Sequence, residues 1–152
     1  IPSASELLEY TLLKNDREVA ELQFNAKVRV ENILQAYGKN LRIRPLSYSL
    51  PMYETPDKRK SGVQFDYPEC YSDTIVYRLN NTKISKAPSN TAIESKYGSY
   101  SVSYTVGQNS LVCTKSLLIA SGKIRLEDYK DFYEFIQSVK NIERQTIYTE
   151  IL

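Results

Sequence analysis

The sequence predicts a mainly β domain: an antiparallel β-sandwich, immunoglobulin-like or related, with one amphipathic helix near the C-terminus. Three observations support this prediction. Runs of alternating apolar and polar residues recur along the chain, turn residues separate them about every ten residues, and the period becomes helical only once, near residue 126. The length of 152 residues suits one domain that can bury its own core.

The first 19 residues are expected to form an N-terminal segment, either a short helix or a linker from a preceding domain. Several leucines lie close together here, and Ser5 could cap a short helix. Tyr10 and Thr11, however, also suit a strand. The β-sandwich domain is therefore expected to occupy residues 20–152.

The clearest strand signal covers residues 20–33, where an apolar residue stands at every second position. A period of two over this length indicates a strand with one buried face. Shorter runs predict further strands, and Pro45 limits how far the first of them can pair. These strands are expected at residues 41–44, 63–67, 71–79, 83–86, 91–97, 100–106 and 111–120, with a last one from residue 146.

A helix is expected at about residues 126–140. Tyr129, Phe132, Ile136 and Val139 recur at helical spacing, with charged residues between them. This pattern indicates an amphipathic helix that packs its apolar stripe on a sheet or closes one end of it.

Composition excludes several classes of function. The chain has no histidine, which excludes Ser-His and Cys-His nucleophile pairs, histidine general bases and histidine-containing zinc sites. A net charge of +2 does not indicate a nucleic-acid partner, and the charge run at residues 57–60 is interpreted as a solvated loop. No stretch approaches the roughly 20 apolar residues of a membrane span. No metal or other cofactor is expected.

The two cysteines, Cys70 and Cys113, are too far apart for a C-x-x-C motif. They are interpreted as two buried thiols, with one disulfide as the alternative. Neither has a histidine partner, so neither is expected to be a nucleophile. Because the chain starts at Ile1 and not at a methionine, we expect a processed chain or a fragment of a longer protein.

The 13 tyrosines are the main candidates for binding. Tyr77 and Tyr100 alternate with aliphatic residues, as does Tyr104, and these three are assigned to the core. Those near loops could present an aromatic surface to a glycan or peptide. The candidate surface-binding aromatics are Tyr53, Tyr67 and Tyr71, with Tyr48 nearby.

Paired carboxylates could hydrolyse a glycoside without histidine. Glu69 and Asp73 are close along the chain, but such pairs are common by chance. No catalytic residue is therefore assigned, and the chain is not expected to be an enzyme.

Five stretches together resemble a known type of domain. Residues 93–100 read IESKYGSY, and residues 128–135 read DYKDFYEF. Residues 59–68, 71–79 and 117–122 read RKSGVQFDYP, YSDTIVYRL and LLIASG. In order and spacing they resemble the uncharacterised C-terminal domain that follows a transglutaminase-like core in many bacterial envelope proteins. One departure is LNNTK at residues 79–83, where that family usually has L-P-x-G-Y.

The resemblance implies a non-catalytic accessory β-sandwich of a larger secreted or periplasmic protein. Such a domain would pack against a neighbouring domain of the same polypeptide, or contact another envelope protein or a polymer. Any catalytic triad would lie in the core outside this chain. The alternative is a stand-alone carbohydrate- or peptide-binding module that uses the loop tyrosines.

Overall fold

A computed structural model describes residues 5–15, 18, 22–30 and 33–152. The chain divides into two compact units, Ile1–Gln35 and Ala36–Leu152. The mainly β fold with antiparallel sheets in an open, sandwich-like arrangement and one C-terminal helix is confirmed. The division at residue 35 differs from the expected one at residue 19, because the long strand of residues 22–30 belongs to the first unit.

The first unit is a hairpin of β1 (Ser5–Asn15) and β2 (Leu22–Val30), which pair antiparallel. For residues 5–13 the sequence left a short helix and a strand open, and the structure shows a strand. Register shifts between Leu7 and Glu9 and between Leu12 and Lys14 interrupt the pairing. Each shift places an extra leucine in β1, and these extra residues hid the strand's alternation in the sequence.

The two shifts keep the hairpin amphipathic. On one face Leu7 pairs with Val28, and Leu12 pairs with Phe24. On the other face the pairs are polar, and two of them are ion pairs: Arg29 Nη1 lies 2.7 Å from Glu6 Oε2, and Lys27 Nζ lies 3.7 Å from Glu9 Oε1.

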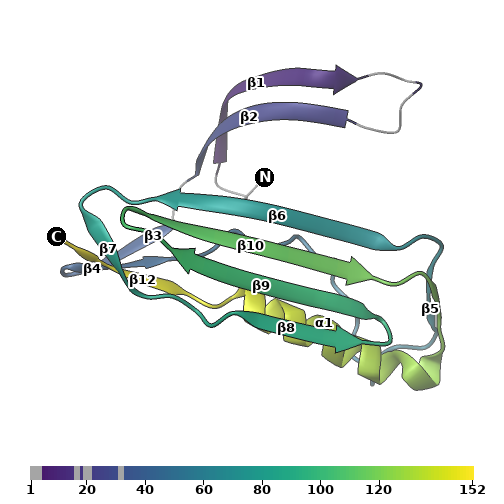
Figure 1. The fold of residues 1–152 in the computed structure, drawn as a ribbon. Coiled ribbons are helices and arrows are strands. Elements are labelled where there is room, and N and C mark those ends of the chain that lie inside the picture. The colour runs from purple at the N-terminus through teal and green to yellow at the C-terminus, as the bar shows by residue number, and fades with distance from the viewer. Residues whose placement is uncertain (1–4, 16–17, 19–21, 31–32) are drawn as a thin grey trace. The chain divides into compact units, whose positions relative to one another are not determined.

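The second unit is built on a four-stranded sheet with the order β6-β10-β9-β8 (Figure 1). Its strands are β6 (Glu69–Arg78), β8 (Thr91–Ser95), β9 (Gly98–Val106) and β10 (Ser110–Ile119). All neighbours pair antiparallel. The sequence predicted each of these strands, with ends that differ by a few residues.

A second four-stranded sheet has the order β3-β4-β12-β7. It contains β3 (Leu34–Tyr37), β4 (Asn40–Ile43), β7 (Thr82–Lys86) and β12 (Ile147–Ile151). Two short strands, β5 (Val63–Phe65) and β11 (Gly122–Ile124), form a separate antiparallel pair.

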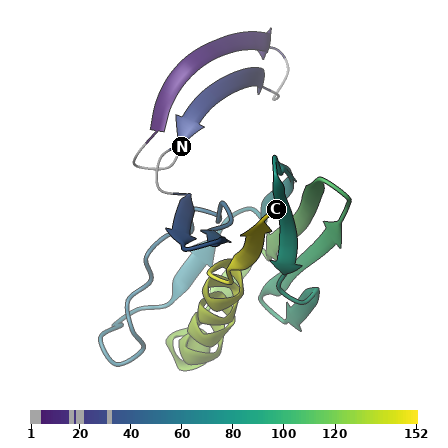
Figure 2. The ribbon, with the colours of Figure 1, turned by 90° about the vertical axis from the view of Figure 1, so that its left-hand side faces the viewer.

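Helix α1 (Tyr129–Glu143) follows a 3-10 turn, η1 (Leu126–Asp128), and lies along one face of the large sheet (Figures 1 and 2). Phe132, Ile136 and Val139 are completely buried. They pack in one cluster with Tyr100 and Leu117 of the sheet. The predicted apolar stripe of the helix thus packs against the large sheet and forms the helix side of the core.

Within the described residues, no helix is both long and apolar enough to cross a membrane.

Candidate functional site

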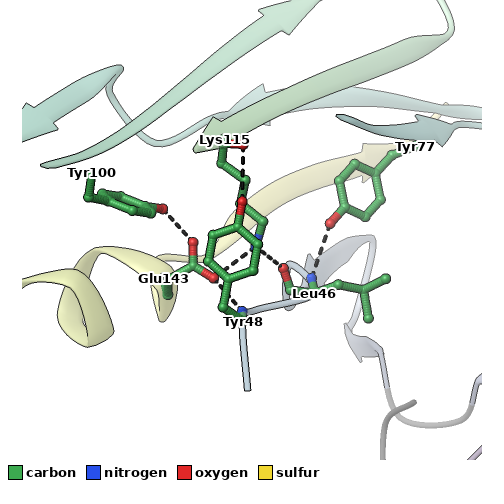
Figure 3. Close-up of polar contacts among 6 residues, drawn as sticks. All are labelled: Leu46, Tyr48, Tyr77, Tyr100, Lys115 and Glu143. Carbon is green, nitrogen blue, oxygen red and sulfur yellow. Dashed lines mark hydrogen bonds and ion pairs between the residues drawn. The ribbon is translucent and has the colours of Figure 1, made fainter. Parts of the chain in front are cut away.

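The sheet and the helix together bury an ion pair between Lys115 of β10 and Glu143 at the end of α1 (Figure 3). Lys115 Nζ lies 2.8 Å from Glu143 Oε2, and the two side chains are only 3% and 5% exposed. Lys115 stands on the inner face of β10, in step with Cys113 and Leu117. Burying two charges is costly unless nearby polar groups complete their hydrogen bonds.

Neighbouring groups supply those hydrogen bonds. The Tyr100 hydroxyl donates to Glu143 Oε1, and the Tyr48 backbone N–H donates to Glu143 Oε2 over 2.8 Å. Lys115 Nζ also donates to the Leu46 carbonyl over 2.6 Å. We call Tyr48, Tyr100, Lys115 and Glu143 the Lys115 cluster. Every carboxylate oxygen in it accepts at least one hydrogen bond.

Tyr48 closes the cluster on the remaining side. Its ring centre lies 4.2 Å from Lys115 Nζ, which is a cation–π contact, and its hydroxyl donates to the Lys115 carbonyl over 3.0 Å. The neighbouring Leu46 N–H donates to the Tyr77 hydroxyl over 3.3 Å. These contacts fasten residues 46–48, which follow β4 without forming a strand, to the large sheet.

The phenols around the cluster are held in their neutral form. Burial is the main reason that the pKa of Tyr100 is raised well above its ordinary value, and its hydrogen bond to Glu143 adds to this shift. Burial, together with the charges of Asp73 and Glu143, raises the pKa of Tyr48 in the same direction. Burial raises the pKa of Tyr77 to about 12. These hydroxyls therefore act as hydrogen-bond donors or acceptors and not as bases near neutral pH.

The arrangement can hold elements together, but it offers little for chemistry on a substrate. Lys115 and Glu143 are enclosed, and their hydrogen-bonding groups are directed at one another or at the backbone of residues 46–48. A general acid or base must reach the proton that it transfers. The Lys115 cluster is thus a structural centre that ties the strands, the helix and the connecting segment together.

Sequence reasoning missed this cluster. The available signal was Lys115 itself, which interrupts the apolar positions of a strand that alternates with period two. Glu143 lies four residues after Val139, on the apolar stripe of the helix. A charge at a core position is rarely left without a partner, so the two positions together indicate a buried pair.

The three candidate binding tyrosines are not brought into one ring cluster. The Tyr53 ring packs edge-on against Phe132 at 5.1 Å, and burial raises its pKa to about 12. The Tyr71 ring lies 5.4 Å from Tyr48, and its hydroxyl donates to Glu69 over 3.2 Å. Tyr67 is 80% exposed. Two of the three thus pack against other rings.

The tyrosines assigned to the core are where the sequence placed them. Tyr100 is fully buried, and Tyr77 and Tyr104 pack against the core cluster. The candidate carboxylates lie on the inner side of β6. Glu69 accepts from Tyr71, and Asp73 stands opposite Lys115 in the strand register.

Both cysteines are free thiols, so the disulfide alternative was wrong. The expectation of two buried thiols holds for Cys113 only, because Cys70 is exposed. Cys70 pairs with Leu118 on the outer face of the sheet, whereas Cys113 pairs with Ile75 on the inner face. Burial raises the pKa of the Cys113 thiol.

Three motifs of the resemblance have clear structural roles. In residues 93–100, Tyr97 is buried and its hydroxyl donates to the Asp128 carbonyl over 2.9 Å. In residues 128–135, Tyr129 and Phe132 are buried in the core. Arg59 places its guanidinium 5.2 Å from the Tyr129 ring centre and donates to the Gly62 carbonyl over 3.1 Å. The contacts of these motif residues hold the fold together.

Comparison with known proteins gives one match. The model of a family described as a domain of unknown function with a solved structure, DUF3858, matches residues 36–149. No curated protein and no solved structure matches the chain. The family model covers most of the chain and nearly all of its second unit. The chain therefore belongs to the DUF3858 family.

Proposed function

We propose that this chain is a non-catalytic accessory domain of a larger secreted or periplasmic bacterial protein that carries a transglutaminase-like core. Its role is to pack against a neighbouring domain or to contact a protein or polymer of the cell envelope. The order of motifs in the second unit supports the transglutaminase-like context, as a resemblance. The observation that carries the packing role is the apolar face of the β1–β2 hairpin.

That face is continuous and open to solvent. Leu12 is 47% exposed and Phe24, its partner across the strands, is 59% exposed. A two-stranded hairpin is at best marginally stable in water, and its apolar face adds a tendency to associate. The opposite face carries two ion pairs and suits solvent. The hairpin therefore has one face for a partner and one face for water.

The Lys115 cluster supports the non-catalytic part of the proposal. It contains an enclosed lysine–carboxylate pair whose hydrogen bonds hold the fold. A binding module based on Tyr53, Tyr67 and Tyr71 has less support, because the Tyr53 and Tyr71 rings pack against Phe132 and Tyr48.

The first test is the size and location of the native protein, by immunoblot of fractions of the source cell with antibody to this chain. We expect a band much larger than 17.5 kDa in the envelope fraction. A band at 17.5 kDa in the cytosolic fraction would contradict the proposal.

A second test addresses the hairpin face. A photo-crosslinking amino acid replaces Phe24 on the apolar face or Asn25 on the polar face, in the native protein in its host. We expect crosslinks from position 24 to a neighbouring domain or an envelope protein, and few from position 25. Equal crosslinking from both positions would argue against a specific apolar contact. Enzyme-like hydrolysis of peptides, amides or glycosides by the purified chain would exclude the non-catalytic role.

A further inference from the structure

The second sheet carries a tyrosine with one cationic residue on each side of it. Tyr148 of β12 pairs with Arg42 of β4 on one side and with Lys86 of β7 on the other. Residues that are directly opposite in antiparallel strands share one face of the sheet. The Arg42 guanidinium carbon lies 5.7 Å from the Tyr148 ring centre. This contact places the guanidinium beside the Tyr148 ring.

Arg42, Lys86 and Tyr148 form part of a pocket with a volume of about 580 Å³, which is within the range of small-ligand sites. The Arg42 pocket, as we call it, belongs entirely to the second unit. Its lining combines two cations, two tyrosine rings and two neutral polar side chains, from Tyr37, Asn40, Arg42, Ser85, Lys86 and Tyr148.

Among the described residues, no carboxylate pairs with either cation of this pocket, Arg42 or Lys86. Glu150, the acidic side chain further along β12, is paired with Lys83 over 3.1 Å. A second hollow adjoins the first, shares Lys86 and Tyr148, and adds Arg144. The site thus has an excess of positive charge and attracts an anion.

Arg42 also has an unused donor. Its Nε is buried and has no hydrogen-bond partner among the described residues. A carboxylate that binds a guanidinium side-on accepts from Nε and from one terminal nitrogen together. Once the groups that cover Nε move aside, such a ligand would give Nε its acceptor. The Lys86 ammonium would attract the same carboxylate from the other side of the Tyr148 ring.

The other side chains that line the pocket indicate which class of anion it binds. Tyr37 is 59% exposed and makes no ring contact with another aromatic residue that the structure describes. An open tyrosine ring can receive the apolar CH face of a sugar, and the Asn40 amide and Ser85 hydroxyl can bond to hydroxyl groups. We propose that the Arg42 pocket binds a carboxylate-bearing sugar unit of an acidic glycan, with the carboxylate between Arg42 and Lys86 and the ring on Tyr37.

Calorimetric titration of the whole chain tests this proposal. The probes are trigalacturonic acid and neutral galactotriose, so that charge is the main difference. We expect binding of the acidic trisaccharide only, with an affinity that falls as sodium chloride is added. Arg42→Gln and Lys86→Gln are each expected to weaken binding about tenfold or more, because each removes a cation that makes charge-assisted hydrogen bonds to the carboxylate.

Matched controls are Arg78→Gln and Lys123→Gln, which neutralise exposed cations on β6 and β11. Both are expected to bind like the unaltered chain. Circular dichroism checks the folding of every variant. Lys86 is exposed, so its variant keeps the test valid if the Arg42 variant does not fold.

Two results would overturn the proposal. One is the absence of binding to trigalacturonic acid, or binding that neither Arg42→Gln nor Lys86→Gln weakens. The other is tighter binding of tetraglutamate with the same sensitivity to both substitutions, which would assign the pocket to an acidic peptide. The pocket and the hairpin face are made of different residues, in different units. Failure of this proposal therefore leaves the proposed packing role standing, and failure of the packing role leaves this site standing.

Discussion

Gly98 lies where the turn between β8 and β9 meets the edge of the core. Its φ of +148° is a conformation that side chains rarely adopt, and a Cβ there would lie 1.9 Å from the Leu118 carbonyl oxygen. The preceding Tyr97 is buried, and its hydroxyl donates a hydrogen bond to the Asp128 carbonyl. The glycine in the IESKYGSY motif is thus needed for two reasons, backbone conformation and close approach.

Gly98→Ala is expected to lower the free energy of unfolding by about 3 kcal/mol or more, because the backbone of β10 would have to move. Gly122→Ala is the matched control. Gly122 has φ +132°, but a Cβ there meets nothing within 4 Å. The control should cost about 1–2 kcal/mol, from strain alone. Urea unfolding of both variants gives the comparison, and equal costs would show that the contact with Leu118 does not matter.

Lys115 is expected to be essential for the stability of the fold as long as Glu143 is present. Lys115→Met should lower the free energy of unfolding by about 3–5 kcal/mol, because a buried carboxylate loses its cation. The double variant Lys115→Met with Glu143→Leu should recover part of this loss. Urea unfolding of the two single variants and the double variant completes the cycle. Additive losses would contradict the direct pairing.

At the scale of elements, the hairpin shows how far a sequence pattern can mislead. β2 was predicted because its alternation is unbroken. β1 was left undecided between helix and strand, because Leu8 and Leu13 lie at the two register shifts and break its period. Once the partner strand is known, the apolar face of β1 is continuous. A bulge is decided by the pairing, so a single strand's sequence does not reveal it.

The Lys115 cluster and the Arg42 pocket also lie beyond what a local sequence pattern can predict. The core tyrosines and the helix stripe could be predicted, because each depends on a local period. Lys115 and Glu143 meet only because α1 packs under β10. Arg42, Lys86 and Tyr148 meet only because β12 returns between β4 and β7. Contacts between distant segments follow from topology, which a local pattern does not specify.

The exposed hairpin face should bind a hydrophobic dye. Phe24→Ser is expected to reduce the fluorescence of 1-anilinonaphthalene-8-sulfonate with the native chain, because it interrupts the apolar face. Asn25→Ser alters the adjacent residue on the polar face and should leave the signal unchanged. A fluorimetric titration of the three chains decides this. Equal reductions in both variants would mean that the dye binds elsewhere.

At the scale of the molecule, the second unit contains a complete core. The core cluster and the hydrophobic residues packed against it all fall between residues 48 and 142. The Lys115 cluster and the family match lie in the same unit. Residues 34–152, which keep β3 intact, should therefore fold alone with a urea midpoint close to that of the whole chain. A midpoint that falls strongly on truncation would show that the hairpin stabilises the core.

Neutral buried tyrosines make the molecule sensitive to alkali. The pKa is raised, chiefly by burial, for Tyr48, Tyr53, Tyr71, Tyr77, Tyr100, Tyr104 and Tyr129. An unfolded tyrosine ionises near pH 10, whereas Tyr53 and Tyr77 ionise in the folded chain at about 12. The unfolded chain therefore releases these protons first as pH rises.

Because the unfolded chain loses these protons at a lower pH than the folded chain, alkali lowers the stability of the fold. The stabilisation that depends on neutral tyrosines is fully present below about pH 10 and is lost as pH rises toward and beyond 12. We expect the free energy of unfolding, measured by urea titration at increasing pH, to fall through this range, with tyrosinate absorbance rising as the chain unfolds. Tyr53→Phe removes one such hydroxyl while keeping the ring beside Phe132. The free energy of unfolding of this variant should therefore fall less steeply with pH. A free energy that stays constant between about pH 9 and pH 12 would mean that these hydroxyls reach solvent in the folded chain.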